Sequence, residues 1–269
     1  YPKWPFDKFD YADKSLGTQM MATGEVMSIG NSFEAAMMKA VSSIELGMDT
    51  LTHKPFEELT DEEVVEHMHV QDAERVFCVY EALKRGIDHK VIYDITKIDW
   101  WFLDKMQHLA DLEKGLAQCN GVLSVEQYKT AKKYGFQDKT IRRLAQVDTL
   151  PVENYRAGFK MVDTCAAEFD AETPYYYSTY DGENEAVDNG SGKKKVLVLG
   201  SGPIRIGQGI EFDYSSVHCV WTLKELGYDV VIVNNNPETV STDFDTGDRL
   251  YFDPLNPESV DNIIATEKP

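Results

Sequence analysis

The stretch KVLVLGSGPIRIGQGIE, residues 195–211, decides the fold of the C-terminal part of this chain. It opens with a short apolar run that enters a glycine-rich loop, which is typical of a buried parallel strand. A helical pattern follows over residues 213–226, and a second apolar run follows at 229–233. This order predicts a strand, a helix and a parallel strand joined by a right-handed crossover. Residues 249–252 fit a third strand and residues 259–266 a second helix.

The loop after the first strand does not match the common nucleotide-binding loops. Glycines at this place let backbone amides approach an anion closely. A dinucleotide site, however, requires glycine where Arg205 stands, and an acidic residue where the next strand ends in Asn234-Asn235-Asn236. There is also no Gly-Lys-Ser/Thr of a Walker A loop. The loop therefore suits a small anionic or carbonyl substrate, with Arg205 as a source of charge; a purely structural turn is the alternative.

A second polar loop, NPETVSTD at residues 236–243, follows the next strand. Because ligands bind at the carboxyl ends of parallel strands, we expect the two loops to border one crevice. Glu211, Asp213, Glu238 and Asp243 would gather there, where carboxylates can relay protons or hold a reactive species. The alternative is that these acids cap the adjacent helices, Asp213 in particular.

Residues 31–146 have the pattern of a compact bundle of short helices. Three segments have the signature of helix starts, in which a polar cap precedes a Glu or Gln by three residues: Asn31–Glu34, Thr60–Glu63 and Ser124–Gln127. The pair Trp100–Trp101 is expected to pack a helix. Residues 1–27 are aromatic and irregular and should pack on the rest of the chain. Residues 162–168 and 175–180 favour extended structure, whereas residues 181–192 have the polar, glycine-rich composition of a linker.

The composition of the 269 residues excludes several classes of protein. With 46 Asp and Glu against 27 Lys and Arg, the net charge is −19, which does not suit nucleic acid or an anionic membrane as a partner. We also expect neither a membrane span, which needs about 18 apolar residues, nor a signal peptide. The four cysteines form no CxxC pair and fit a reducing cytosol, so we expect a cytoplasmic protein.

The two loop sequences together resemble a known family. Residues 200–218, GSGPIRIGQGIEFDYSSVH, and residues 233–252, VNNNPETVSTDFDTGDRLYF, resemble the start of the second synthetase half of carbamoyl phosphate synthetase large chains. The resemblance extends upstream through residues 18–40, IDWWFLDKM at 98–106, and MVDTCAAEF and YYYSTY at 161–180. It covers essentially the whole chain.

The patterns predict an α/β protein overall, with a mainly helical bundle followed by a partial parallel α/β domain. The resemblance implies that the second domain is Rossmann-like and of the pre-ATP-grasp type. It further implies that residues 1–27 are the tail of the first ATP-grasp half and residues 28–170 a helical oligomerisation domain. Residues 171–192 would then be a connector, and residues 193–269 the start of the carbamoyl-phosphate-forming half.

The resemblance also implies a ligase. The complete enzyme makes carbamoyl phosphate from bicarbonate, glutamine-derived ammonia and two ATP, for arginine and pyrimidine biosynthesis. It uses Mg²⁺ or Mn²⁺ and K⁺, and a small amidotransferase subunit or domain supplies the ammonia. The nucleotide and metal residues of that family lie outside this segment, so we expect the 269 residues alone to bind none of these cofactors tightly and to be inactive. A non-catalytic module that self-associates through its helices is the alternative.

Four residues of this chain match the family's passage for carbamate, which leads from the first synthetase half to the second. Gly209 and Glu211 match a Gly-Ile-Glu motif that lines the passage in the family, and Glu238 matches a further carboxylate of the passage. Asp7 stands where some members of the family carry Glu. Arg205 and Asn236 lie on the same loops. No catalytic, cofactor-binding or metal residue is expected in this segment.

Overall fold

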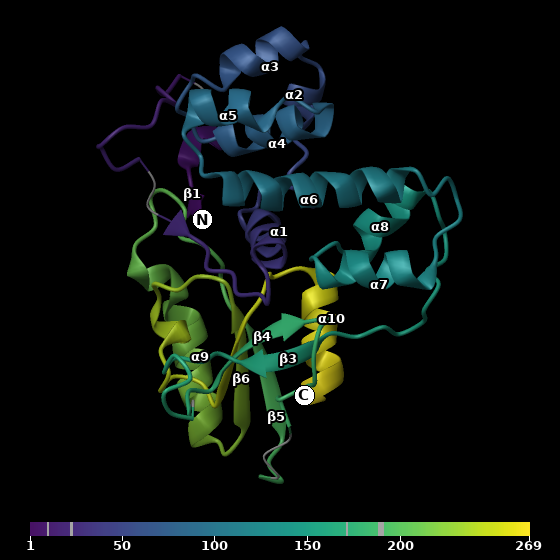
Figure 1. Ribbon diagram of the computed structural model, residues 1–269. Coiled ribbons are helices and arrows are strands. Elements are labelled where there is room, and N and C mark those ends of the chain that lie inside the picture. The colour runs from purple at the N-terminus through teal and green to yellow at the C-terminus, as the bar shows by residue number, and fades with distance from the viewer. Residues whose placement is uncertain (10, 22–23, 171, 188–190) are drawn as a thin grey trace.

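The computed structural model describes residues 1–9, 11–21, 24–170, 172–187 and 191–269, and it contains a helical part and an α/β part (Figure 1). The α/β prediction is confirmed. The helical part contains α1 (Phe33–Ser43), α2 (Lys54–Glu57), α3 (Asp61–His67), α4 (Arg75–Arg85), α5 (His89–Thr96), α6 (Trp100–Ala117), α7 (Val125–Lys133) and α8 (Asp138–Ala145).

The α/β part is a sheet in the order β3-β4-β7-β6-β5, with α9 (Tyr214–Glu225) and α10 (Pro257–Glu267) beside it (Figure 1). Strands β4, β7, β6 and β5 run parallel, and β3 pairs with β4 antiparallel. The strands are β3 (Gly158–Met161), β4 (Tyr175–Thr179), β5 (Lys195–Leu199), β6 (Asp229–Asn234) and β7 (Arg249–Phe252).

Local sequence explains where the helices of the first part begin. Thr60 and Glu63 form a complete capping box at α3, with Thr60 Oγ1 accepting from the Glu63 backbone N at 3.2 Å and the Glu63 carboxylate accepting from the Thr60 N at 2.8 Å. Ser124 and Gln127 form the same box at α7. At α1 the predicted box is wrong: Ser32 is the cap, one residue later than expected.

Glu34 does not reach back to the start of α1 because it has partners on another helix. Its side chain is buried, and its Oε1 lies 2.9 Å from His108 Nδ1 and 3.6 Å from Lys105 Nζ, both on α6. Burial alone would raise the pKa of Glu34, but the hydrogen bond with His108 and the charge of Lys105 outweigh it and lower the pKa. The carboxylate therefore ties α1 to α6 rather than capping α1.

The core of the helical part forms around α4 and α6. Phe77, Tyr80, Leu103 and Leu109 on these two helices are 1% exposed or less. The Trp pair at the start of α6 packs only in part. Trp100 stacks on Tyr93 of α5, yet 43% of Trp100 and 51% of Trp101 remain exposed.

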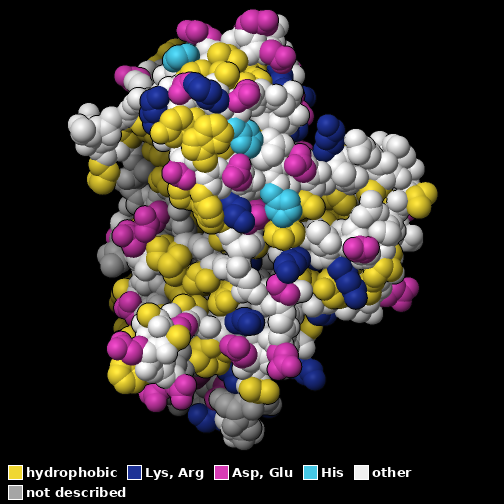
Figure 2. All heavy atoms as spheres, viewed as in Figure 1, with side chains coloured by type: hydrophobic (Ala, Val, Ile, Leu, Met, Phe, Trp, Pro, Cys, Tyr) yellow, Lys and Arg dark blue, Asp and Glu magenta, His cyan; other side chains and the backbone are white. Residues whose placement is uncertain are grey.

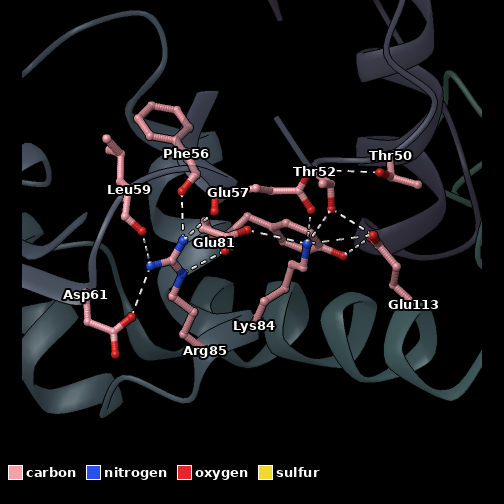
Figure 3. Close-up of polar contacts among 11 residues, drawn as sticks. Thr50, Thr52, Phe56, Glu57, Leu59, Asp61, Glu81, Lys84, Arg85 and Glu113 are labelled. Carbon is pink, nitrogen blue, oxygen red and sulfur yellow. Dashed lines mark hydrogen bonds and ion pairs between the residues drawn. The ribbon is translucent and has the colours of Figure 1, made fainter. Parts of the chain in front are cut away.

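A cluster of polar contacts connects helix α4 with the segment that contains α2 and the start of α3 (Figure 3). The Arg85 guanidinium donates to the backbone carbonyls of Phe56 at 2.8 Å and Leu59 at 2.7 Å, and to the Asp61 and Glu81 carboxylates. Hydrogen bonds to carbonyls at fixed positions hold a loop in one conformation. The cluster therefore has a structural role in the helical part, in which Arg85 connects the end of α4 to the residues before α3.

The sheet is larger than the sequence predicts. Strand β4 lies within residues 171–192, predicted as a connector, and it confirms the extended structure predicted for residues 175–180. Residues 162–168 form no strand, and β3 lies just before them, within the residues predicted as helical domain. The aromatic run Tyr175–Thr179 fits between β3 and β7 because Tyr175 packs against Phe252 and Tyr176 stacks on Tyr251, both of them buried in β7. Strand β5, predicted as buried, is the last strand in the described order, and Leu199 is 54% exposed.

Strand β6 shows why this sheet separates two cores. All of its residues are buried, and they alternate between the two faces. Val231 and Val233 pack with Ile263 of α10, whereas Val230 and Ile232 pack with Val220 of α9. The run of β-branched residues at 229–233 therefore forms a strand that is covered on both sides.

The N-terminal segment packs on both parts of the molecule, as predicted. Strand β1 (Pro2–Lys3) pairs antiparallel with β2 (Gly24–Glu25), and the terminal amine of Tyr1 donates to the Val26 carbonyl at 2.8 Å. The Tyr1 ring lies 6.5 Å from that of Phe77 in α4. The backbone N of Met27 donates at 2.8 Å to Asn235 O, just after β6.

Candidate functional site

Two loops leave the carboxyl ends of β5 and β6, and one side chain joins them. Asn234, the last residue of β6, is fully buried. Its Oδ1 accepts from the backbone N of Gly202 at 3.1 Å, and its Nδ2 donates to the Ser241 hydroxyl at 3.1 Å. A Cβ at residue 200 would collide with the Asn234 side chain, so Gly200 permits this close approach. The two loops are therefore held side by side, as expected from the strand order.

Asp213 makes a second link between the same loops. It lies at the end of the 3₁₀ helix η2 (Ile210–Asp213), and its Oδ2 accepts from Thr239 Oγ1 at 2.6 Å and from Ser241 N at 2.9 Å. Within the described residues its side chain makes no capping bond to α9, so the capping alternative for Asp213 is wrong. The carboxylate binds Thr239, just before η3 (Val240–Thr242), and Ser241 within η3, instead of the first turn of its own helix.

Three of the four predicted passage residues, Gly209, Glu211 and Glu238, lie on these two linked loops. Gly209 precedes η2, and a Cβ there would collide with the carboxylate of Glu211. Glu211 is exposed, and so is Glu238 in the other loop. Asp213 is the only buried member of the four acids that were expected to gather, and Asp243 is exposed. The side chain of Asp7, in η1 (Pro5–Asp7), lies outside the described part of the structure.

Arg205 does not present a spare charge to the crevice, contrary to expectation. Its Nε and Nη2 donate to Oε2 and Oε1 of Glu45 at 2.9 and 2.8 Å. Glu45 follows α1, 160 positions away in the sequence. The charge of Arg205 is therefore matched by a carboxylate of the helical part, and no local pattern could have indicated that partner.

Asn236 and its neighbours leave buried polar atoms beside the second loop. Asn236 Oδ1 accepts from the Glu238 backbone N at 2.9 Å, which shapes the turn that presents Glu238. Among the residues that the structure describes, Asn236 Nδ2, Asn235 Oδ1 and one oxygen of Asp213 are buried without a protein partner. Such atoms usually bind ordered water or a ligand. The sequence had marked Asn234 only as a departure from a dinucleotide site, and so missed its role in joining the loops.

The described residues do not fit a metal centre. No group of three or more His, Cys, Asp or Glu side chains in the described ranges is close enough to hold an ion such as Mg²⁺ or Mn²⁺. Over the same described ranges, no helix is both long and apolar enough to cross a membrane.

On the face in Figure 2, acidic and basic side chains are interspersed, and hydrophobic side chains reach the surface over the helical part.

Two family models match adjacent parts of the chain. Residues 25–160 match the oligomerisation domain of the carbamoyl-phosphate synthetase large chain, which is half of the sequence. The chain belongs to the carbamoyl phosphate synthase large chain family. Residues 192–269 match the preATP-grasp domain of the same family, so the two linked loops lie in that domain.

Curated relatives carry the same family name. The chain is 52% identical over 274 residues to the carbamoyl phosphate synthase large chain of Agathobacter rectalis, and 53% identical over 275 residues to that of Lachnoclostridium phytofermentans. It is 51% identical over 276 residues to the large chain of Clostridium acetobutylicum. Each match covers 100% of this chain but only 25 or 26% of the relative. The chain thus spans about a quarter of the length of these large chains.

Proposed function

We propose that these residues are the central segment of a large chain that makes carbamoyl phosphate from bicarbonate, ammonia released from glutamine and two ATP. The observation that carries this proposal is the pair of adjacent matches to the oligomerisation and preATP-grasp domains, with relatives above 50% identity along the whole segment. We further propose that the protein is cytoplasmic, serves arginine and pyrimidine biosynthesis, and receives ammonia from an amidotransferase partner. ATP and its metal ions would bind elsewhere in the large chain.

Within this function, we propose that the loops after β5 and β6 form part of the wall of a passage for carbamate. Asn234 and Asp213 support this proposal because they hold the two loops together and leave Glu211 and Glu238 exposed. Glutamate oxygens can accept hydrogen bonds from the amino group of carbamate or from a water that accompanies it. The passage would in this way keep an unstable intermediate away from bulk solvent.

The test is to replace Glu211 and Glu238 by glutamine together in the complete large chain that contains this segment, assayed with its amidotransferase. We expect glutamine-dependent carbamoyl phosphate synthesis to fall about tenfold, the effect of losing a charge-assisted hydrogen bond of about 1.4 kcal/mol. Bicarbonate-dependent ATP hydrolysis should persist. Glu126→Gln, an exposed glutamate on α7, is the matched control. Unchanged synthesis in the double variant would refute the proposal that these loops form the wall of the passage. A wild-type protein that makes no carbamoyl phosphate would refute the proposed function itself.

A self-associating helical part is the second function that we propose, and the match to an oligomerisation domain favours it. Exposed aromatic side chains at the start of α6 agree with it, because Trp100, Trp101 and Phe102 are 43, 51 and 43% exposed. We expect the 269-residue chain to form concentration-dependent dimers or larger oligomers in size-exclusion chromatography with light scattering. A strict monomer over a hundredfold range of concentration would contradict self-association through this segment.

A further inference from the structure

The ion pair between Arg205 and Glu45 joins the glycine loop to the helical part. Arg205 Nε and Nη2 donate to separate oxygens of the Glu45 carboxylate, at 2.9 and 2.8 Å. This bidentate geometry fixes the orientation of the two side chains as well as their distance. Arg205 also donates its backbone N to Gln208 Oε1 at 2.9 Å, within the same loop. The pair therefore acts on the segment that leads directly to Gly209 and Glu211.

Glu45 occupies an unfavourable backbone conformation. Its φ is 61°, in the left-handed region, immediately after Ile44, the C-cap of α1. Glycine or asparagine adopts this conformation more readily than glutamate does, and a strained residue is often kept for the position of its side chain. Here the side chain is the carboxylate that receives Arg205. Lys97, Gln146 and Lys268 adopt the same conformation at the ends of other helices, so what distinguishes Glu45 is that its carboxylate receives Arg205.

A second close contact holds the same loop from the N-terminal segment. A Cβ on Gly24 of β2 would overlap the backbone carbonyl of Ile204, so the two backbones touch. A cavity of about 260 Å³ lies between the N-terminal segment and this loop, and its lining includes Trp4, Lys8, Glu45 and Arg205. The loop after β5 is thus held between the N-terminal strand pair β1–β2 and Glu45, the residue that follows the cap of α1.

We propose that Glu45 is a positioning residue for carbamate transfer. By holding Arg205, it keeps the Gly209–Glu211 step aligned with the rest of the passage, although Glu45 itself belongs to the oligomerisation domain. This inference rests on the proposed function. It assigns to the helical part a direct effect on the transfer of the intermediate between the two synthetase halves, in addition to self-association.

The test measures the ATP consumed per carbamoyl phosphate formed, in the complete large chain with its amidotransferase. Glu45→Gln and Arg205→Gln are each expected to lower carbamoyl phosphate formation about 10- to 100-fold, as a misplaced loop would. Bicarbonate-dependent ATP hydrolysis should be nearly unchanged, so the ratio of ATP to product rises. The exchanged pair Glu45→Arg with Arg205→Glu should restore most of the product. Arg143→Gln, which breaks a half-exposed pair with Asp49 inside the helical part, is the matched control.

Glu45→Gly provides a check against simple loss of folding. It removes the carboxylate and also relieves the strain of the left-handed backbone at residue 45. The variant should therefore unfold no more easily than the wild type, and it should still consume more ATP per carbamoyl phosphate formed. An unchanged ratio in Glu45→Gln, equal losses of both activities, or no rescue by the exchanged pair would each overturn the positioning role. A wild-type protein without carbamoyl phosphate synthesis would instead overturn the proposed function, and this inference with it.

Discussion

Removing both carboxylates beside Lys132, by Glu258→Gln together with Asp138→Asn, is expected to lower the free energy of unfolding of this chain by about 3–5 kcal/mol. The Lys132 side chain, at the end of α7, is only 1% exposed. Its ammonium group contacts the Glu258 carboxylate of α10 and lies 2.9 Å from Asp138 Oδ1. The double variant would leave a buried cation without a counter-charge, which is the costly state for an ion pair.

The same contacts connect the helical part to the α/β part. Glu258 also accepts from the backbone N of Asp138 at 2.7 Å and from the Tyr180 hydroxyl at 3.3 Å. Burial alone would lower the pKa of Lys132, but the nearby carboxylates of Glu258 and Asp138 outweigh it and raise the pKa. The ammonium therefore stays charged over the pH range in which the folded protein is studied.

Urea unfolding followed by circular dichroism and tryptophan fluorescence measures this effect. Adding Lys132→Met to the double variant should recover most of the lost stability, because an apolar side chain then replaces the unpaired charge. Asp181→Asn is the matched control, since it breaks the exposed pair with the neighbouring Lys133 and should have a much smaller effect. If the double variant is no less stable than this control, the buried pair does not stabilise the chain.

The sequence predicts the features that depend on local pattern. The apolar runs at 195–199 and 229–233 predicted β5 and β6, and the boxes at Thr60 and Ser124 predicted the starts of α3 and α7. In each case the residues that determine the structure lie within a few positions of one another. The resemblance to the family added the identity of both domains, which the two family matches bear out.

The features that the sequence missed depend on residues far apart in the chain. Residues 175–180 favour extended structure, but their place in the main sheet could not be predicted, because β7, one of the two strands that β4 pairs with, comes more than 70 positions later. Glu45 could not be paired with Arg205 from either local pattern. Asp213 looked like a cap because it precedes α9, yet its partners belong to the loop after β6. In the candidate site, sequence therefore indicated the loops, and long-range hydrogen bonds decided the role of each side chain.

Replacing Glu267 by glutamine should have an effect of similar size in the α/β part, about 3–5 kcal/mol at pH 7. Glu267 ends α10, and its side chain is 1% exposed. It receives Arg249 Nη1 at 2.8 Å, Lys195 Nζ at 3.0 Å and the Tyr251 hydroxyl, so it joins α10 to strands β5 and β7. The glutamine variant would keep the shape of the side chain while leaving two largely buried cations without their carboxylate.

The pH dependence of stability separates this charge effect from a packing defect. Burial alone would raise the pKa of Glu267, but hydrogen bonds from Tyr251, Lys195 and Arg249 outweigh it and lower the pKa below its usual value of 4.5. Because the folded pKa is lowered, the contribution of Glu267 is fully present above about pH 4.5 and is lost as the pH falls through the folded pKa. The difference in unfolding free energy between wild type and Glu267→Gln should therefore be constant from pH 7 to about pH 5 and shrink at lower pH. A difference that does not change down to pH 3 would show that the glutamine acts through packing and not through the lost charge.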